Sequence, residues 1–136
     1  RYARADDLGF ELRQARLQDT KNRQNSIEMD IADDTHRQIA YQWENLQNDL
    51  LKRTKDVYTW ALDKGIAKEQ ARAVLPEGNT KSRMYMNGTL RSWVHYIQLR
   101  SGNGTQKEHR DVAIACANAI EPIFPMISEY IDAQPE

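Results

Sequence analysis

The sequence predicts a mostly helical protein built around one long helix, with a minor share of strand. Apolar residues recur at three- and four-residue steps from about residue 35 to residue 62, which is typical of an amphipathic helix. Asp34 or Thr35 is placed to cap its start, and Gly65 to end it. The residues predicted to face inward are Ile39, Trp43, Leu46, Leu50, Val57 and Ala61, and the apolar stripe is widened by Ala40, Leu51, Tyr58 and Leu62.

Shorter elements follow the same periodicity. A short helix is predicted over 67–75 and should stop at Pro76, because proline disfavours helical geometry in the residue before it. Alternating polar and apolar residues make 27–31 and 81–86 candidate strands, although polar flanks support the first one poorly. Further helices are predicted over 90–100, capped by Thr89, over 106–120, with Val112, Ala113, Cys116, Ala119, Ile120 and then Ile123 inward, and over 126–131.

Length and composition limit the classes of protein. The 136 residues, 40% of them hydrophobic, suffice for one domain, so residues 1–136 are assigned to a single domain. No apolar run approaches the roughly 20 residues that span a bilayer, and we expect a soluble, cytoplasmic protein. The presence of a single cysteine, Cys116, fits a reducing compartment, and its apolar neighbours predict that it is a small buried hydrophobic residue. The chain begins at Arg1-Tyr2 without a methionine, and we interpret it as the later part of a longer protein.

Positive charge gathers in residues 71–110, although the whole chain carries a formal charge of -1. Five arginines stand there against two glutamates, and they are interleaved with Tyr85, Trp93 and Tyr96. Arginine binds phosphate or ring carbonyls bidentately and stacks on planar rings, so this mixture favours a planar anionic ligand such as a nucleotide. No metal-ligand spacing, phosphate-loop glycine pattern or nucleophile motif is present, which points to cofactor chemistry if the protein is an enzyme.

Two functional classes remain open on the residues alone. One is a nucleotide-using, cofactor-dependent enzyme. The other is a non-catalytic helical module whose basic segment, residues 71–110, binds nucleic acid, a nucleotide or an acidic partner. The second is disfavoured because Lys81 and Lys107 are the only lysines in the segment and the total charge is slightly negative.

The predicted helix over 90–100 separates its arginines by direction. At about 100° per residue, Arg91, His95 and Gln98 share one stripe, whereas Arg100 lies opposite Arg91. One helix could therefore border two pockets.

Three blocks of the sequence resemble the flavin-dependent thymidylate synthases. ARAVLP at 71–76, RSWVHYIQLR at 91–100 and QKEHR at 106–110 are similar to that family's ARxVLP, NxRxxxHFxxLR and AQxEIR, in order and at nearly the same spacing. The family's hallmark RHRxxSxNExSxRY would end at Arg1-Tyr2, so the chain would correspond to the C-terminal part of such an enzyme. Thr89 stands where the family usually has Asn.

The resemblance implies an α+β fold and a homotetramer with active sites shared between subunits, cytoplasmic and of bacterial or viral origin. Such an enzyme methylates dUMP to dTMP, with methylenetetrahydrofolate as carbon donor and NADPH as reductant through FAD. It uses no enzyme nucleophile, metal, membrane or nucleic-acid partner.

The family's pattern also implies residue roles. Arg1, Arg72 and Arg100 would bind dUMP, and Arg100 would be catalytic, because a cation hydrogen-bonded to the uracil ring stabilises the charge that makes C5 nucleophilic. The flavin site would be lined by Thr89, Leu90, Arg91 and His95. Gln106 and Glu108 are interpreted as structural.

Overall fold

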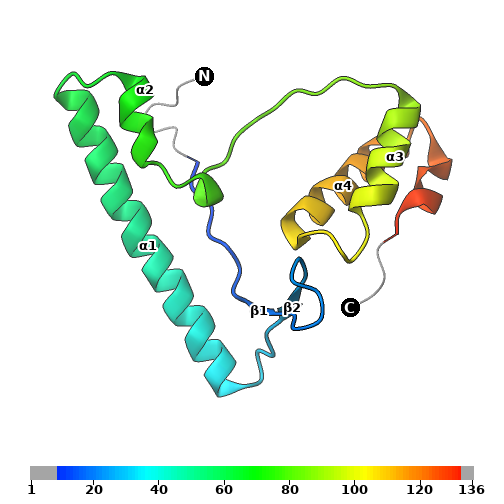
Figure 1. The fold of residues 1–136 in the computed structure, drawn as a ribbon, viewed down its shortest axis with the longest axis horizontal. Helices are drawn as coiled ribbons and strands as arrows, with labels where there is room; N and C mark the ends of the chain where they lie inside the picture. Colours follow the sequence, from blue (N-terminus) through cyan, green and yellow to red (C-terminus); the bar gives the residue numbers. More distant parts are fainter. Residues whose placement is uncertain (1–8, 133–136) are drawn as a thin grey trace. The chain divides into compact units, whose positions relative to one another are not determined.

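The computed structural model describes residues 9–132, and this part of the chain is an α+β protein with a two-stranded antiparallel sheet (Figure 1). Arg1 lies outside the described residues. Contacts divide the chain into two compact units, residues 9–15 with 29–84 and residues 16–28 with 85–132. The assignment of residues 1–136 to a single domain stays a prediction. The elements are β1 (Arg16–Gln18), β2 (Ser26–Glu28), α1 (Asp34–Asp63), α2 (Lys68–Ala71), η2 (Arg72–Val74), η3 (Glu77–Asn79), α3 (Leu90–Arg100), α4 (Lys107–Ile120) and η4 (Pro125–Tyr130).

Helix α1 dominates the first unit and is delimited by local hydrogen bonds. Its cap is Asp33, one residue before the predicted position, because the Asp33 carboxylate accepts the Thr35 backbone N–H at 2.8 Å. At the other end Gly65 adopts a left-handed φ of 78°, as the prediction of a glycine stop requires. Gly65 N–H donates to the Leu62 carbonyl and Ile66 N–H to the Ala61 carbonyl, both at 3.0 Å, which completes the C-terminal cap.

The buried face of α1 differs from the predicted one. The buried residues are Gln47, Leu51, Thr54, Tyr58 and Ala61. Leu51 and Tyr58, which the sequence predicts to widen the apolar stripe, are thus at the centre of the buried face, and most of the six residues predicted to face inward are exposed. Tyr58 and Ala61 pack on Ala71 of α2, with Leu62 and Leu75 against them. Of the predicted inward residues, Ala61 is buried and Val57 half-buried, and the other four are exposed.

The polar side chain of Gln47 is buried because the chain satisfies all its hydrogen bonds. Its Oε1 accepts the Arg13 backbone N–H at 2.7 Å, and its Nε2 donates to the Arg13 carbonyl at 2.9 Å. Asn79 Nδ2 also donates to Gln47 Oε1 at 3.0 Å. The side chain therefore ties residues 9–15 and η3 to the middle of α1.

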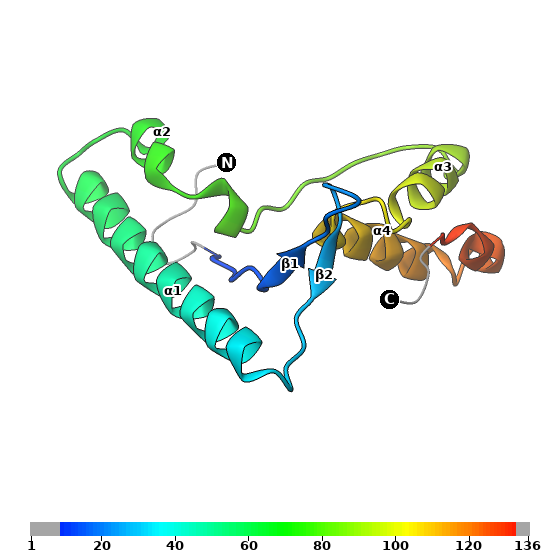
Figure 2. The same cartoon turned by 60° about the horizontal axis from the view of Figure 1, so that its bottom comes forward.

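The short helix predicted over 67–75 is confirmed as α2 followed by the 3₁₀ turn η2, ending before Pro76 (Figure 2). The strand predicted over 81–86 is wrong: residues 81–89 have no regular structure. The pairing that exists lies just before it, where Phe10 and Thr80 form an isolated antiparallel bridge. Among residues 9–132, nothing pairs with the backbone of residues 82–86, so alternation alone does not make a strand there.

The second unit contains the sheet. β1 and β2 pair antiparallel with Leu17 opposite Ile27, and the polar loop 19–25 joins them (Figure 2). Only Ile27 and Glu28 of the candidate strand over 27–31 lie in β2. In the loop, Asp19 accepts the backbone N–H of Lys21 at 2.8 Å and of Asn22 at 3.2 Å. These bonds and the Asn25 side chain lower the pKa of Asp19.

Helices α3 and α4 pack side by side, and η4 lies against both (Figure 1). Ile97, Ala117 and Ile127 are fully buried between them, and Cys116 packs half-buried against this core. Helix α3 has the predicted bounds, and η4 confirms the predicted last helical segment. On α4 the buried residues are Arg110, Ala113 and Ala117, so the prediction that Val112, Ala119 and Ile123 face inward is wrong.

Among residues 9–132, no helix combines the length and the apolar composition needed to cross a bilayer.

Candidate functional site

Thr89 begins the candidate site because it caps α3. Its Oγ1 accepts the Ser92 backbone N–H at 3.2 Å and lies 3.0 Å from the Ser92 hydroxyl. The hydroxyl is therefore already used within the helix cap, and a ligand at Thr89 would have to share it. Leu90, the first residue of α3, keeps about half of its surface exposed beside this cap.

The regular geometry of α3 separates two sets of predicted site residues. Arg91 and His95 are both exposed and lie one turn apart on the same stripe. Arg100 is the last residue of the helix, also exposed, and about 180° around the axis from Arg91. Nine residues of helix separate the two arginines by about 13 Å along the axis. The structure thus brings the predicted flavin residues together and holds Arg100 apart from them.

The corner after Arg100 is well anchored. Ser101 is completely buried, its N–H donates to the Ile97 carbonyl at 2.9 Å, and its Oγ accepts the Asp132 N–H at 2.7 Å. Thr105, at the far end of the loop, is also buried. Because the next residue is fixed on the inside, the backbone that carries the exposed Arg100 side chain has little freedom.

A hydrogen bond between Tyr96 and His109, not anticipated from the sequence, lies beside Arg100. The Tyr96 hydroxyl is 3.1 Å from His109 Nε2, and the Tyr96 ring meets Trp93 edge-to-face at 5.8 Å. Burial raises the pKa of Tyr96 above its ordinary value of 10.0, while the positive charge of Arg100 acts in the opposite direction. Tyr96 stands one turn before Arg100, and this i, i+4 spacing was the signal that could have placed the two on one face.

The second unit also has a hollow of about 400 Å³ between the β1–β2 hairpin and the start of α4, lined by Asn25, Ser26, Ile27, Glu28, Asn103 and Arg110. Arg110 is 7% exposed and donates to Asn103 Oδ1 at 3.0 Å. It is therefore not the surface residue that its charge would suggest.

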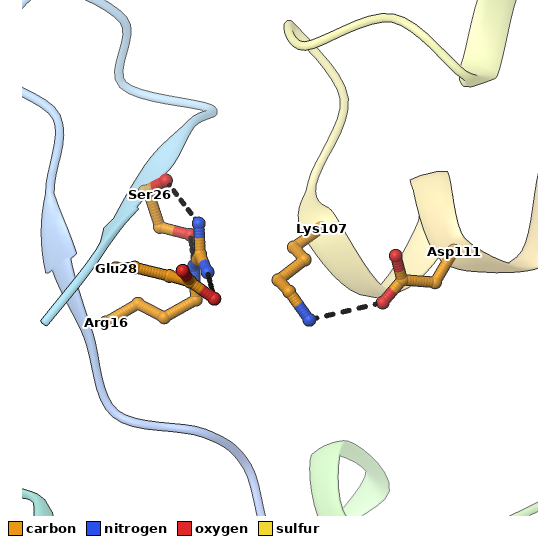
Figure 3. Close-up of polar contacts among 5 residues, drawn as sticks. All are labelled: Arg16, Ser26, Glu28, Lys107 and Asp111. Atoms are coloured by element: carbon orange, nitrogen blue, oxygen red, sulfur yellow. Dashed lines mark hydrogen bonds and ion pairs between the residues drawn. The ribbon is translucent and has the colours of Figure 1, made fainter. Parts of the chain in front are cut away.

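Figure 3 shows how the hairpin holds a second buried arginine. Arg16 Nε donates to Ser26 Oγ at 2.7 Å, and Arg16 Nη1 lies 3.5 Å from Glu28 Oε1. On α4, Lys107 pairs with Asp111 at 3.3 Å. Of the two charged residues that line the hollow, Glu28 is thus paired with Arg16, and Arg110 is hydrogen-bonded to Asn103.

Arg72 belongs to the first unit. It is the first residue of η2 and is exposed, next to Ala71, which is buried against α1. Of the three predicted dUMP-binding residues, the structure thus places one in each unit, and Arg1 lies outside the described residues. Within residues 9–132, no three His, Cys, Asp or Glu residues are close enough to hold a metal ion together.

Comparisons with a family model and with individual known proteins all point to one family. The family model described as "Thymidylate synthase complementing protein" matches residues 1–126. A probable flavin-dependent thymidylate synthase of Paramecium bursaria Chlorella virus 1 is 46% identical over 119 residues, covering 88% of this chain and 52% of the viral protein. A flavin-dependent thymidylate synthase of Synechocystis is 41% identical over 132 residues, covering 97% of this chain and 58% of the cyanobacterial protein.

A more distant relative, the flavin-dependent thymidylate synthase of Corynebacterium glutamicum, is 32% identical over 87 residues, covering 64% of this chain and 34% of the relative. The chain therefore spans only about half the length of the two most similar of these relatives.

Proposed function

The chain belongs to the thymidylate synthase complementing protein family, and its relatives are named flavin-dependent thymidylate synthases. We therefore propose that it is part of an enzyme that methylates dUMP to dTMP. The carbon donor is methylenetetrahydrofolate, and NADPH supplies the reducing equivalents through FAD. The observation that carries this proposal is the geometry of α3, where Arg100 and the Arg91–His95 stripe occupy opposite faces of one helix.

Arg100 acts on the pyrimidine. Its guanidinium binds the uracil ring and stabilises the negative charge that makes C5 nucleophilic. Such a role needs a cation whose position is fixed before the substrate arrives, and the buried Ser101 supplies that anchor. Arg72 and Arg1 bind dUMP as well, and Arg72 contributes binding energy through charge-assisted hydrogen bonds.

The residues of the first turns of α3 fit a flavin. Leu90 offers exposed apolar surface, and Arg91 and His95 offer exposed donors on one stripe, which together suit a planar ring system with polar edges. Bound FAD supplies the hydride chemistry that protein side chains lack. No protein nucleophile is needed, and Cys116 packs half-buried against the α3–α4 core, where it has no such role.

The enzyme is a homotetramer with active sites shared between subunits. The exposed apolar residues of α1, which a monomer has no reason to present to water, support self-association.

The test uses the full-length protein. We expect a flavin absorbance spectrum that NADPH bleaches, and dTMP formation from dUMP and methylenetetrahydrofolate. Arg100→Ala should lower kcat by about 100- to 1000-fold, as loss of an electrostatic stabiliser does. Arg72→Ala should chiefly weaken dUMP binding, by about 10- to 100-fold in Kd.

Arg23→Ala is the matched control, because Arg23 is an equally exposed arginine in the hairpin loop and has no predicted role. It should behave like the unmodified protein. Turnover of Arg100→Ala at the unmodified rate would remove Arg100 from the mechanism. A colourless protein that binds oligonucleotides tightly and in a salt-sensitive way would instead support the nucleic-acid-binding module.

A further inference from the structure

One face of α1 carries a regular apolar seam that the described part of the chain leaves exposed. Most of its side chains, including Trp43, Leu46, Leu50 and Trp60, are between 43% and 64% exposed. Val57 is half-buried. The buried face of α1, centred on Leu51 and Tyr58, points about 100° away, so the seam is a second face and not the edge of the first.

The spacing of this seam is that of a coiled coil. Its positions alternate steps of four and three residues over three heptads. In chain order they are Ile39, Trp43, Leu46, Leu50, Arg53, Val57 and Trp60. At 1.5 Å per residue the seam is about 31 Å long, which is enough for a helix–helix contact over its whole length. Arg53 is the only charged member.

We propose that this seam pairs with the same seam of a second copy of the chain, with the two α1 helices antiparallel. A two-fold axis between residues 51 and 52 places Leu46 opposite Val57 of the second copy and Trp43 opposite its Trp60. Two apolar layers then form on each side of the axis, one of Leu46 with Val57 and one of Trp43 with Trp60, in which the tryptophans bury each other.

Charge decides the orientation. In the antiparallel pair, Arg53 lies in the layer of Leu50 of the second copy and beside its Asp49, which flanks the seam. Neither Arg53 nor Asp49 has an ion-pair partner within residues 9–132. A parallel pair would instead bring Arg53 against Arg53 in an apolar layer, where burial of two like charges is strongly unfavourable.

This inference rests on the proposed self-association and adds the surface, the orientation and the register. The experiment uses the full-length protein with Cys116→Ser, so that introduced thiols are the only ones in residues 1–136. We expect Leu46→Cys/Val57→Cys to form a disulfide-linked dimer under mild oxidation, because the antiparallel register brings these positions together. Each single cysteine variant should stay unlinked.

The matched control is Tyr41→Cys/Leu62→Cys, whose positions have the same symmetry relation but lie on the opposite side of α1. It should not cross-link. Cross-linking by Leu46→Cys alone would indicate a parallel pair and overturn the proposal, as would an absence of cross-linking in the Leu46→Cys/Val57→Cys variant.

A charge reversal tests Arg53 separately. Arg53→Asp should raise the dissociation constant for self-association by about tenfold or more, and the additional change Asp49→Arg should restore it. Sedimentation measures both. Cross-linking in a protein that makes no dTMP would refute the proposed activity and still support the pairing of the two α1 helices. If the protein forms dTMP but its double cysteine variant does not cross-link, the pairing of the α1 helices is refuted and the proposed activity is supported.

Discussion

Single side chains explain how α3 and α4 stay in register near Arg100. The core residues between the helices are small or aliphatic and are not directional, since Ile97 packs against Ala117 and Ile127. The hydrogen bond between Tyr96 and His109 adds a directional contact at the surface end of the same interface. The two side chains therefore fix where the last turn of α3 lies relative to the first turn of α4.

We predict that Tyr96 and His109 are energetically coupled. Tyr96→Phe and His109→Leu should each lower the free energy of unfolding by about 0.5 to 1.5 kcal/mol, the net value of one hydrogen bond. The double variant should lose less than the sum, because neither polar group is left without its partner. Urea unfolding of the four proteins measures the coupling. Tyr130→Phe combined with His109→Leu is the control, and the two losses of stability should add. Additive losses for Tyr96→Phe and His109→Leu as well would show that the hydrogen bond contributes nothing.

The hairpin loop gives a prediction for acid pH. The backbone N–H of Lys21, the Asn25 side chain and the backbone N–H of Asn22 all stabilise ionised Asp19, so its folded pKa lies below the ordinary value of 3.8. A lowered folded pKa contributes stability that is present above 3.8 and is lost as pH falls through the folded value. An NMR titration of the Asp19 carboxyl should have its midpoint below 3.8.

Asn25→Ala should move that midpoint upward, since it removes one of the three hydrogen bonds, and Thr20→Ala in the same loop should leave it in place. A midpoint at or above 3.8 in the unmodified protein would show that the loop does not hold the carboxylate as described.

Among the elements, helix bounds were predictable and buried faces were not. Capping residues are local, so Thr89 and Gly65 mark the ends of α3 and α1 where the sequence places them. Burial depends on what the rest of the chain covers. Small residues such as Ala113 and Ala117 let α4 approach α3 closely, so they are buried in place of the larger Val112. Gln47 is buried because residues far away in sequence satisfy its amide.

The end of α1 gives a prediction on stability. Gly65→Ala should cost about 1 to 2 kcal/mol, because a side chain disfavours the left-handed conformation that this glycine adopts. Apart from the adjoining residues, no atom of residues 9–132 lies within 4 Å of the added Cβ, so the cost is conformational and not steric. Gly78→Ala is the control, since that site is equally open and lacks a positive φ. Denaturant unfolding should show Gly78→Ala near neutral. Equal effects of the two changes would contradict the argument.

At the scale of the whole molecule, the sequence could predict directions around one helix but not relations between helices. The opposite faces of Arg91 and Arg100 follow from nine residues of regular helix and are present in α3. The partnership of Tyr96 with His109 depends on how two helices pack, and no spacing within either helix encodes it. The basic segment of residues 71–110 is likewise contiguous in sequence, yet its arginines belong to two compact units.

The bond between Ser101 and Asp132 links residues that are far apart in sequence. Because the Asp132 N–H donates to the hydroxyl of the residue directly after Arg100, the segment that contains Asp132 supports from a distance the arginine that we propose to bind the pyrimidine. Trimming the chain before residue 132 would thus loosen a guanidinium that the trimmed residues never touch, and such a deletion would mimic a defect in the active site.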